Sequence, residues 1–194
     1  MHLQEGLLTR RTIYKFKKDS IDPAIIQRAL ESAVHAPNHK MTQPWHFYVL
    51  QREAKTKLAQ RKKEMKWEGF LDKESDHAKK AGEAAYEYIN DLPAVIVVTA
   101  HRYSVDPVRE REDYAAVCCA VENFMLALWS EGVGSKWSTG GLVNDGEIHN
   151  IIGAGEEESA AAVLYVGYPS EIPKRQQRNV EESITWVDET EYPG

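Results

Sequence analysis

The chain has 194 residues, 42% of them hydrophobic, and a formal net charge of -6. This length and composition predict one domain, residues 1–194, with one substantial core. The acidic balance argues against general binding to nucleic acid or to an anionic membrane, because both need a basic surface.

The sequence predicts neither a membrane span nor a secretion signal. No apolar run reaches the roughly 18 residues of a membrane span, and Met1–Glu5 do not begin a basic segment followed by an apolar one, so we expect no signal peptide. Cys118 and Cys119 are adjacent and are the only cysteines. A disulfide framework is therefore implausible, and we expect a reducing cytoplasm.

The first third of the chain alternates helices with extended segments. We expect an amphipathic helix over residues 1–9, followed by the basic, extended segment "RRTIYKF". Residues 22–34 predict a helix, because Asp22 can cap it, Pro23 suits its first turn and apolar residues recur at helical spacing. A shaped loop then leads into a strand, "HFYVLQ".

The middle of the chain contains the clearest strand. Residues 53–90 are charged and mostly helical, with "WEGFLDK" as a break or a lid. "PAVIVVTAH" (93–101) is continuously apolar, which predicts a strand buried on both faces. A long, Ala-rich helix is expected over Arg111–Glu131.

The last third predicts further short elements around a sheet. We expect a strand and turn in "GVGSKWSTGG" (132–141), a short helix capped by Asn144, a buried strand over 160–169 and a last strand over 183–188. The sheet would hold about four or five strands, which indicates an α+β or three-layer architecture.

Three segments could carry chemistry. Arg10, Arg11 and Thr12 offer two guanidiniums and a hydroxyl, which suit a phosphate, although a solvated basic segment is the alternative. His35 and His39 have a zinc-like spacing, but Pro37 lies between them, so half-buried, hydrogen-bonded histidines are the more ordinary reading.

The third segment is "GVGSKWSTGG", which is only superficially like a phosphate loop. It lacks both Gly-x-Gly-x-x-Gly and Gly-Lys-Ser/Thr. Its glycines could present backbone N–H groups to the edge of a ligand. A plain tight turn would need glycine as well.

The order of these segments is more specific than any one of them. A helix leading into "RRTIYKF", a helix ending in "HAPNHKMTQPWHF", and then "PAVIVVTA", "GVGSKWSTGGL" and "VLYVGYP" resemble the FMN-dependent nitroreductase family over nearly the whole chain. "APNHKMTQPWHF" is similar to the short branch of that family, which carries Ala-Pro-Asp-His-Lys there.

This resemblance implies a fold and an assembly. The fold would be α+β, with a central mixed, mostly antiparallel sheet between helical layers. The protein would be a homodimer that exchanges its C-terminal strand and holds two noncovalent FMN sites at the subunit interface. The sequence agrees, because "SITWVDETEYPG" ends the chain on apolar residues that could add to a partner's sheet.

The resemblance also implies site residues. Arg10, Arg11 and Thr12 would hold the FMN phosphate, and His35 and His39 would reach FMN from the partner chain. Trp137, Ser138, Thr139 and Gly140 would lie near the flavin ring. Lys174, Arg175 and Arg178 are further candidates for the phosphate. Tyr14 and Met41 stand where many relatives have a basic residue and an asparagine, respectively.

The implied activity is that of a flavin oxidoreductase. Hydride would pass from NADH or NADPH through flavin N5 to a nitro compound, quinone or similar small molecule in a ping-pong cycle. The flavin would carry the chemistry, so no catalytic side chain is expected. Two alternatives stay open: an FMN carrier or sensor without turnover, and a metal hydrolase that uses His35 and His39.

Overall fold

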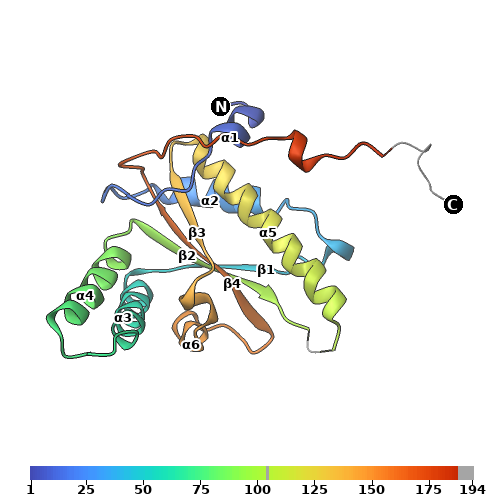
Figure 1. Ribbon diagram of the computed structural model, residues 1–194. Coiled ribbons are helices and arrows are strands. Elements are labelled where there is room, and N and C mark those ends of the chain that lie inside the picture. Colours follow the sequence, from blue (N-terminus) through green and yellow to red (C-terminus); the bar gives the residue numbers. More distant parts are fainter. Residues whose placement is uncertain (104, 188–194) are drawn as a thin grey trace.

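The computed structural model describes residues 1–103 and 105–187. As far as residue 167 the helices and strands follow one another in the order that the sequence predicts, and the expected three layers are present (Figure 1). The α-helices are α1 (Leu3–Thr9), α2 (Pro23–Ala33), α3 (Arg52–Glu68), α4 (Asp76–Asn90), α5 (Pro107–Ser130) and α6 (Glu147–Ile152). The strands are β1 (Trp45–Val49), β2 (Ala94–His101), β3 (Gly134–Ser138) and β4 (Glu158–Gly167). Short 3-10 helices are η1 (His39–Met41), η2 (Gly141–Asn144) and η3 (Glu181–Ser183).

The sheet has the strand order β1-β2-β4-β3, and each neighbouring pair is antiparallel. Its parallel component is a single bridge between Thr12 and Ser135. β2 and β4 are therefore central, while β1 and β3 are the edge strands. The expectation of a mostly antiparallel sheet is confirmed.

Helices cover both faces of this sheet. α2 and α5 lie on one face, and α3, α4 and α6 lie on the other (Figure 1). The continuous apolar run of β2 follows from this arrangement, because Ile96 and Val98 pack toward α5 while Val95 and Val97 pack toward α3 and α4. Every one of these four side chains is fully buried, as the sequence predicts.

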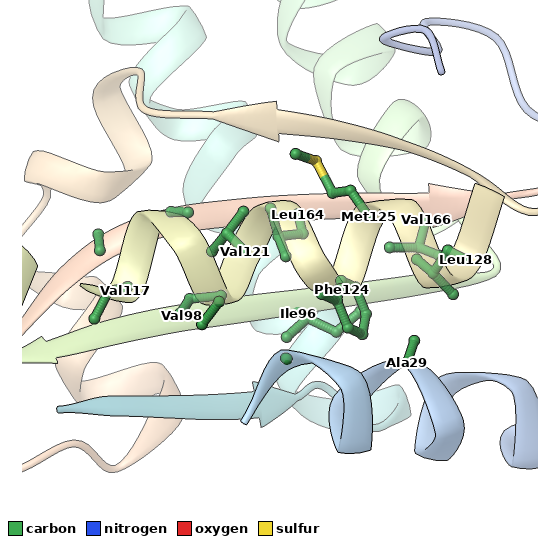
Figure 2. Packing of buried hydrophobic residues seen from close by; sticks show 14 of the residues in the cluster. Ala29, Ile96, Val98, Val117, Val121, Phe124, Met125, Leu128, Leu164 and Val166 are labelled. Carbon is green, nitrogen blue, oxygen red and sulfur yellow. The ribbon is translucent and has the colours of Figure 1, made fainter. Parts of the chain in front are cut away.

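The first core is built on α5. The inward-facing side chains of α5 lie over β2 and β4. Among them, Phe124 points toward Ile96 of β2 and toward α2 (Figure 2). The buried apolar residues of α5 that face this core are Val117, Ala120, Val121, Phe124, Met125 and Leu128. Among the helices of the described residues, none is long and apolar enough to cross a membrane.

Several expected boundaries are confirmed. α2 begins at Pro23, and the Asp22 carboxylate accepts a hydrogen bond from the Ala24 N–H at 2.9 Å. The charged region predicted to be helical divides into α3 and α4, with its break between residues 68 and 76.

Three boundaries differ from the sequence expectations. α5 begins at Pro107, four residues earlier than predicted, because Asp106 caps it by accepting from the Arg109 N–H. Asn144 does not cap α6, because it ends η2; Gly146 is the capping position, and the Asp145 carboxylate accepts from the Glu147 N–H.

The third difference concerns the end of the chain. Residues 183–187 form no strand in this single chain, and residue 188 lies outside the described residues. After β4 the chain passes α1 and extends away from the body (Figure 1). Its apolar side chains are exposed there, and Trp186 is 91% exposed.

Candidate functional site

The basic N-terminal segment lies along the free edge of β3. Thr12 bridges Ser135, and the Ile13 N–H donates to the Ser135 carbonyl at 3.0 Å. This pairing needs very close packing, since a Cβ on Gly134 would lie 2.5 Å from Cγ1 of Ile13. The structure therefore brings Arg10, Arg11 and Thr12 beside the start of β3, whose other end carries residues 137–140.

The two arginines have different partners. Arg10 donates from Nε to Oε1 of Glu122 on α5 at 3.1 Å, and its side chain is 23% exposed. Arg11 donates from Nη1 to the backbone carbonyls of Leu8, at 3.1 Å, and of Arg10. Each guanidinium carries five N–H donors, so both keep donors for an anion.

The turn after β3 forms the second part of the candidate site. Ser138 ends the strand, and Thr139 and Gly140 are exposed. Trp137 packs against the core on the α5 face, and its buried indole Nε1 has no hydrogen-bond partner among the described residues. The exposed residues Thr139 and Gly140 are therefore the part of this turn that a ligand can reach, whereas the Trp137 indole nitrogen lies inside the core.

His35 and His39 lie elsewhere in the chain. His39 pairs through Nδ1 with Oε2 of Glu112, at 2.8 Å, near the start of α5. The loop around it is strained, with positive φ angles at Lys40, Met41 and Gln43. Strain of this kind gathers at ligand-binding segments, but by itself it identifies no ligand.

One chain does not bring the two groups of predicted residues together. Glu122, which holds Arg10, and Glu112, which holds His39, are ten residues apart on α5. That separation corresponds to about 15 Å along a helix. Contacts of His35 and His39 with a cofactor beside β3 stay a prediction.

The model of the Nitroreductase family matches residues 7–168, a span that includes the end of α1, the basic segment and all four strands. The chain belongs to the nitroreductase family.

A curated relative agrees with this membership. The chain is 30% identical over 178 residues to YfhC of Bacillus subtilis (strain 168), provisionally named an NAD(P)H nitroreductase. The match covers 91% of this chain and 89% of YfhC.

Solved nitroreductase structures share the fold. A nitroreductase-like protein of Bacillus cereus superposes with a TM-score of 0.82 at 23% identity, covering 97% of each chain. A nitroreductase of Bacteroides fragilis solved with bound FMN superposes with a TM-score of 0.75 at 22% identity, covering 97% of this chain and all of that one.

The sequence analysis did not single out Lys136, which precedes Trp137 and the turn after β3. Lys136 alternates with Trp137 on β3, so its side chain leaves the α5 face and points toward α3 and α4. Its ammonium lies 5.3 Å from the centre of the Tyr14 ring. The sequence "SKWS" does indicate that Lys136 and Trp137 point to opposite faces of a strand. It does not indicate which helices cover each face, so the neighbours of Lys136 could not be predicted.

A buried carboxylate near the histidine loop was also missed. Asp113 of α5 is 1% exposed and accepts a hydrogen bond from the Thr42 hydroxyl at 2.7 Å. Its second oxygen has no partner among the described residues. The contact attaches the strained loop to α5.

Proposed function

We propose that this protein is an FMN-dependent oxidoreductase of one domain, residues 1–194, that oxidises NADH or NADPH. One observation carries the proposal: Arg10–Thr12 lie beside the start of β3, and residues 137–140 form the end of β3 and the turn after it. The chain also belongs to the nitroreductase family. A nitroreductase of this fold was solved with FMN, and YfhC is provisionally named for NAD(P)H.

The donors beside β3 fit an FMN phosphate. Two arginines and a hydroxyl stand in consecutive positions, and the Nη groups of Arg10 are not used by Glu122. A phosphate carries about two negative charges, close to that of a phosphorylated side chain, and forked guanidinium donors match its oxygens. Three further basic residues can add to the same end of the cofactor. The Ser170 N–H donates to the Lys15 carbonyl, which brings the segment after β4 beside the basic N-terminal segment. The exposed basic residues of that segment are Lys174, Arg175 and Arg178.

The turn after β3 would hold the other end of the cofactor. Trp137, Ser138, Thr139 and Gly140 would line the flavin ring, and exposed backbone at Thr139 and Gly140 would offer N–H donors that orient it. His35 and His39 would contact the same cofactor from the partner subunit, which makes the homodimer part of the proposal.

The protein supplies no acid, base or nucleophile in this proposal. Bound FMN would take hydride at N5 from NADH or NADPH and reduce a nitro compound, quinone or similar small molecule in a ping-pong cycle. The residues around β3 bind and orient the cofactor. We place the enzyme in the cytoplasm, since Cys118 and Cys119 are free thiols.

The two other hypotheses are less well supported. An FMN carrier would have the same binding residues, so only turnover separates it from an enzyme. The hydrolase needs three protein ligands; over residues 1–103 and 105–187, no three His, Cys, Asp or Glu side chains form such a group.

A turnover assay tests the proposal. Purified protein with FMN should oxidise NADH or NADPH when menadione or nitrofurazone is added, with repeated turnovers per bound flavin. FMN binding without turnover, over a range of nitro and quinone acceptors, would favour the carrier. Turnover that is lost on removal of FMN and restored by adding it back would support the enzyme.

A further inference from the structure

Helix α3 lies against the segment that continues the turn after β3. A Cβ on Gly141 would lie 2.8 Å from Cε of Met65, so this methionine of α3 contacts the residue that follows Gly140. Arg61 connects the same stretch of α3 to the chain after η2, through hydrogen bonds of 2.9 and 2.7 Å to the Asp145 carboxylate. The helix therefore borders the turn that is proposed to hold the flavin ring.

Two lysines lie on the same face of α3 as Met65. Positions 62, 65 and 66 have the spacing i, i+3 and i+4, which places their side chains on one face of a helix. Lys62 is half-buried and Lys66 is exposed. The lysine face of α3, formed by Lys62, Met65 and Lys66, is therefore the face that meets the turn.

The carboxylates of α3 do not neutralise these lysines. Glu64 and Glu68 both pair with Arg61, each at 3.5 Å from its Nη1. Over residues 1–103 and 105–187, neither Lys62 nor Lys66 forms an ion pair with a carboxylate. The positive charge of the lysine face is thus not balanced within the described part of the chain.

A third cation adds to the repulsion at this face. Burial lowers the pKa of Lys62, and the charges of Lys136 and Lys66 lower it further. The Lys136 ammonium lies over the rings of Tyr14 and Tyr165, and ring faces carry no net charge that could neutralise it. Like charges held close together raise the free energy of the site, so an anion that binds between them is favoured.

The position of the lysine face indicates which anion. The FMN phosphate is proposed to lie with Arg10–Thr12, beside the start of β3, whereas the lysine face meets the turn after the other end of β3. In the proposed cycle, the electron acceptor has to lie on the flavin ring near that turn. Ammonium groups donate strong hydrogen bonds to carboxylates. A carboxylate on the acceptor could therefore reach the lysines while its reducible group lies over the ring.

We propose that the lysine face selects electron acceptors that carry a carboxylate, such as nitro-substituted aromatic acids. This inference rests on the proposed function and names the substrate class of that site. Lys62 and Lys66 bind the carboxylate and contact no reacting atom, so they determine specificity and take no part in the transfer of electrons. Their contribution should appear in KM rather than in kcat, because the carboxylate is bound equally before and during the reaction.

The test compares two acceptors of nearly the same shape. One is para-nitrobenzoate, which carries the charge, and the other is para-nitrobenzamide, its neutral counterpart. A carboxylate withdraws electrons from the ring less than a carboxamide does, so intrinsic reactivity favours the amide. The original protein should nevertheless have a kcat/KM about tenfold higher for the acid, since a hydrogen bond between charged groups contributes at least this much.

Variants of the lysine face locate the preference. Lys66→Gln should raise the KM for para-nitrobenzoate about tenfold more than the KM for para-nitrobenzamide, and Lys62→Gln should act in the same direction. Lys66→Arg should keep the preference for the acid. Lys63→Gln is the matched control, because Lys63 is next to Lys62 in the sequence but pairs with Glu83 of α4. Its loss should leave the ratio of the two acceptors unchanged.

The contrary outcomes separate this inference from the proposed function. Equal kcat/KM for the two acceptors in the original protein would overturn the inference and leave the proposed function intact. Lysine variants that weaken both acceptors alike, or that raise only the KM for NADH or NADPH, would overturn it too. If the protein binds no FMN, or reduces neither these acceptors nor menadione, the proposed function fails and this inference fails with it. Should Lys62→Gln not fold, the exposed Lys66 allows the same comparison.

Discussion

Arg10 and Glu122 form an ion pair across 112 positions of sequence, with 3.1 Å between Nε and Oε1. The pair attaches the end of α1 to the middle of α5 and uses only one donor of the guanidinium. Its two Nη groups form no hydrogen bond with another of the described residues. The ion pair thus holds a partly exposed arginine in place for an anion.

Replacing this arginine tests its proposed contact with the phosphate. Arg10→Ala should weaken FMN binding by about tenfold to a hundredfold, since a hydrogen bond to a charged group contributes roughly 1.5–3 kcal/mol. Quenching of FMN fluorescence on titration with protein measures the dissociation constant.

Arg28→Ala is the matched control for this change. Arg28 also pairs with a glutamate at α5, Glu131, at 2.9 Å from Nε, but it lies on α2 outside the proposed site. Its loss should leave FMN affinity unchanged. Equal affinity in Arg10→Ala and Arg28→Ala would remove Arg10 from the site.

The second prediction concerns the close approach of Ile13 to Gly134 of β3. In Gly134→Ala the new Cβ would lie 2.5 Å from Cγ1 of Ile13 and 3.0 Å from Cγ of Pro169. Overpacking of this kind typically lowers the free energy of unfolding by 1–3 kcal/mol. Urea denaturation should show this loss, and FMN binding should weaken because Thr12 moves with Ile13.

Gly146→Ala provides the comparison for Gly134→Ala. A Cβ there meets nothing within 4 Å, and the backbone has a helical φ of -60°. We expect its stability to be unchanged or slightly raised. A similar loss in both variants would contradict the packing argument.

The exposed end of the chain predicts a dimer. Light scattering should give twice the 22.0 kDa mass of one chain. Trp186→Ser should shift the equilibrium toward the single chain, since it removes a large apolar side chain that the single chain leaves exposed. Leu71→Ser, which changes an exposed residue between α3 and α4, should not. A single-chain mass for the unchanged protein would contradict the shared site.

Acid should weaken the contact between α3 and α6. Hydrogen bonds from Arg61, at 2.9 and 2.7 Å, lower the pKa of Asp145 more than burial raises it. Because the folded pKa lies below the unfolded value of about 3.9, the stabilisation is present above that pH and is lost as pH falls through the folded pKa.

Asp145→Asn isolates this contribution. The free energy of unfolding should differ between the original protein and Asp145→Asn at pH 7, and the difference should shrink below about pH 4. Urea denaturation at several pH values measures it. A difference that is the same at pH 3 and pH 7 would mean that the Asp145 charge does not contribute.

Local signals in the sequence were sufficient for much of the fold. Asp22 and Pro23 mark the start of α2, and the unbroken apolar run of β2 indicates burial on both faces. The start of α5 was missed although "DP" at Asp106 and Pro107 has the same pattern, because the charged residues after it obscure the apolar spacing. Those charges lie on a solvent-facing first turn.

The candidate site was less predictable for a physical reason. Arg10–Thr12 and the turn after β3 could be found because each carries its chemistry in consecutive residues. The surroundings of Lys136 could not, since they depend on its pairing with Tyr165 across β3 and β4 and on the approach of Tyr14 from the N-terminal segment. Contacts between segments that are distant in the sequence produce no local pattern from which they could be predicted.

The most direct measurement is the absorption spectrum of the purified protein with FMN, recorded under nitrogen before and after NADH or NADPH is added. The account predicts a bound flavin spectrum that bleaches on addition of either nucleotide and returns when a quinone is added. A protein that takes up no FMN, or a bound flavin that neither nucleotide bleaches, would contradict it.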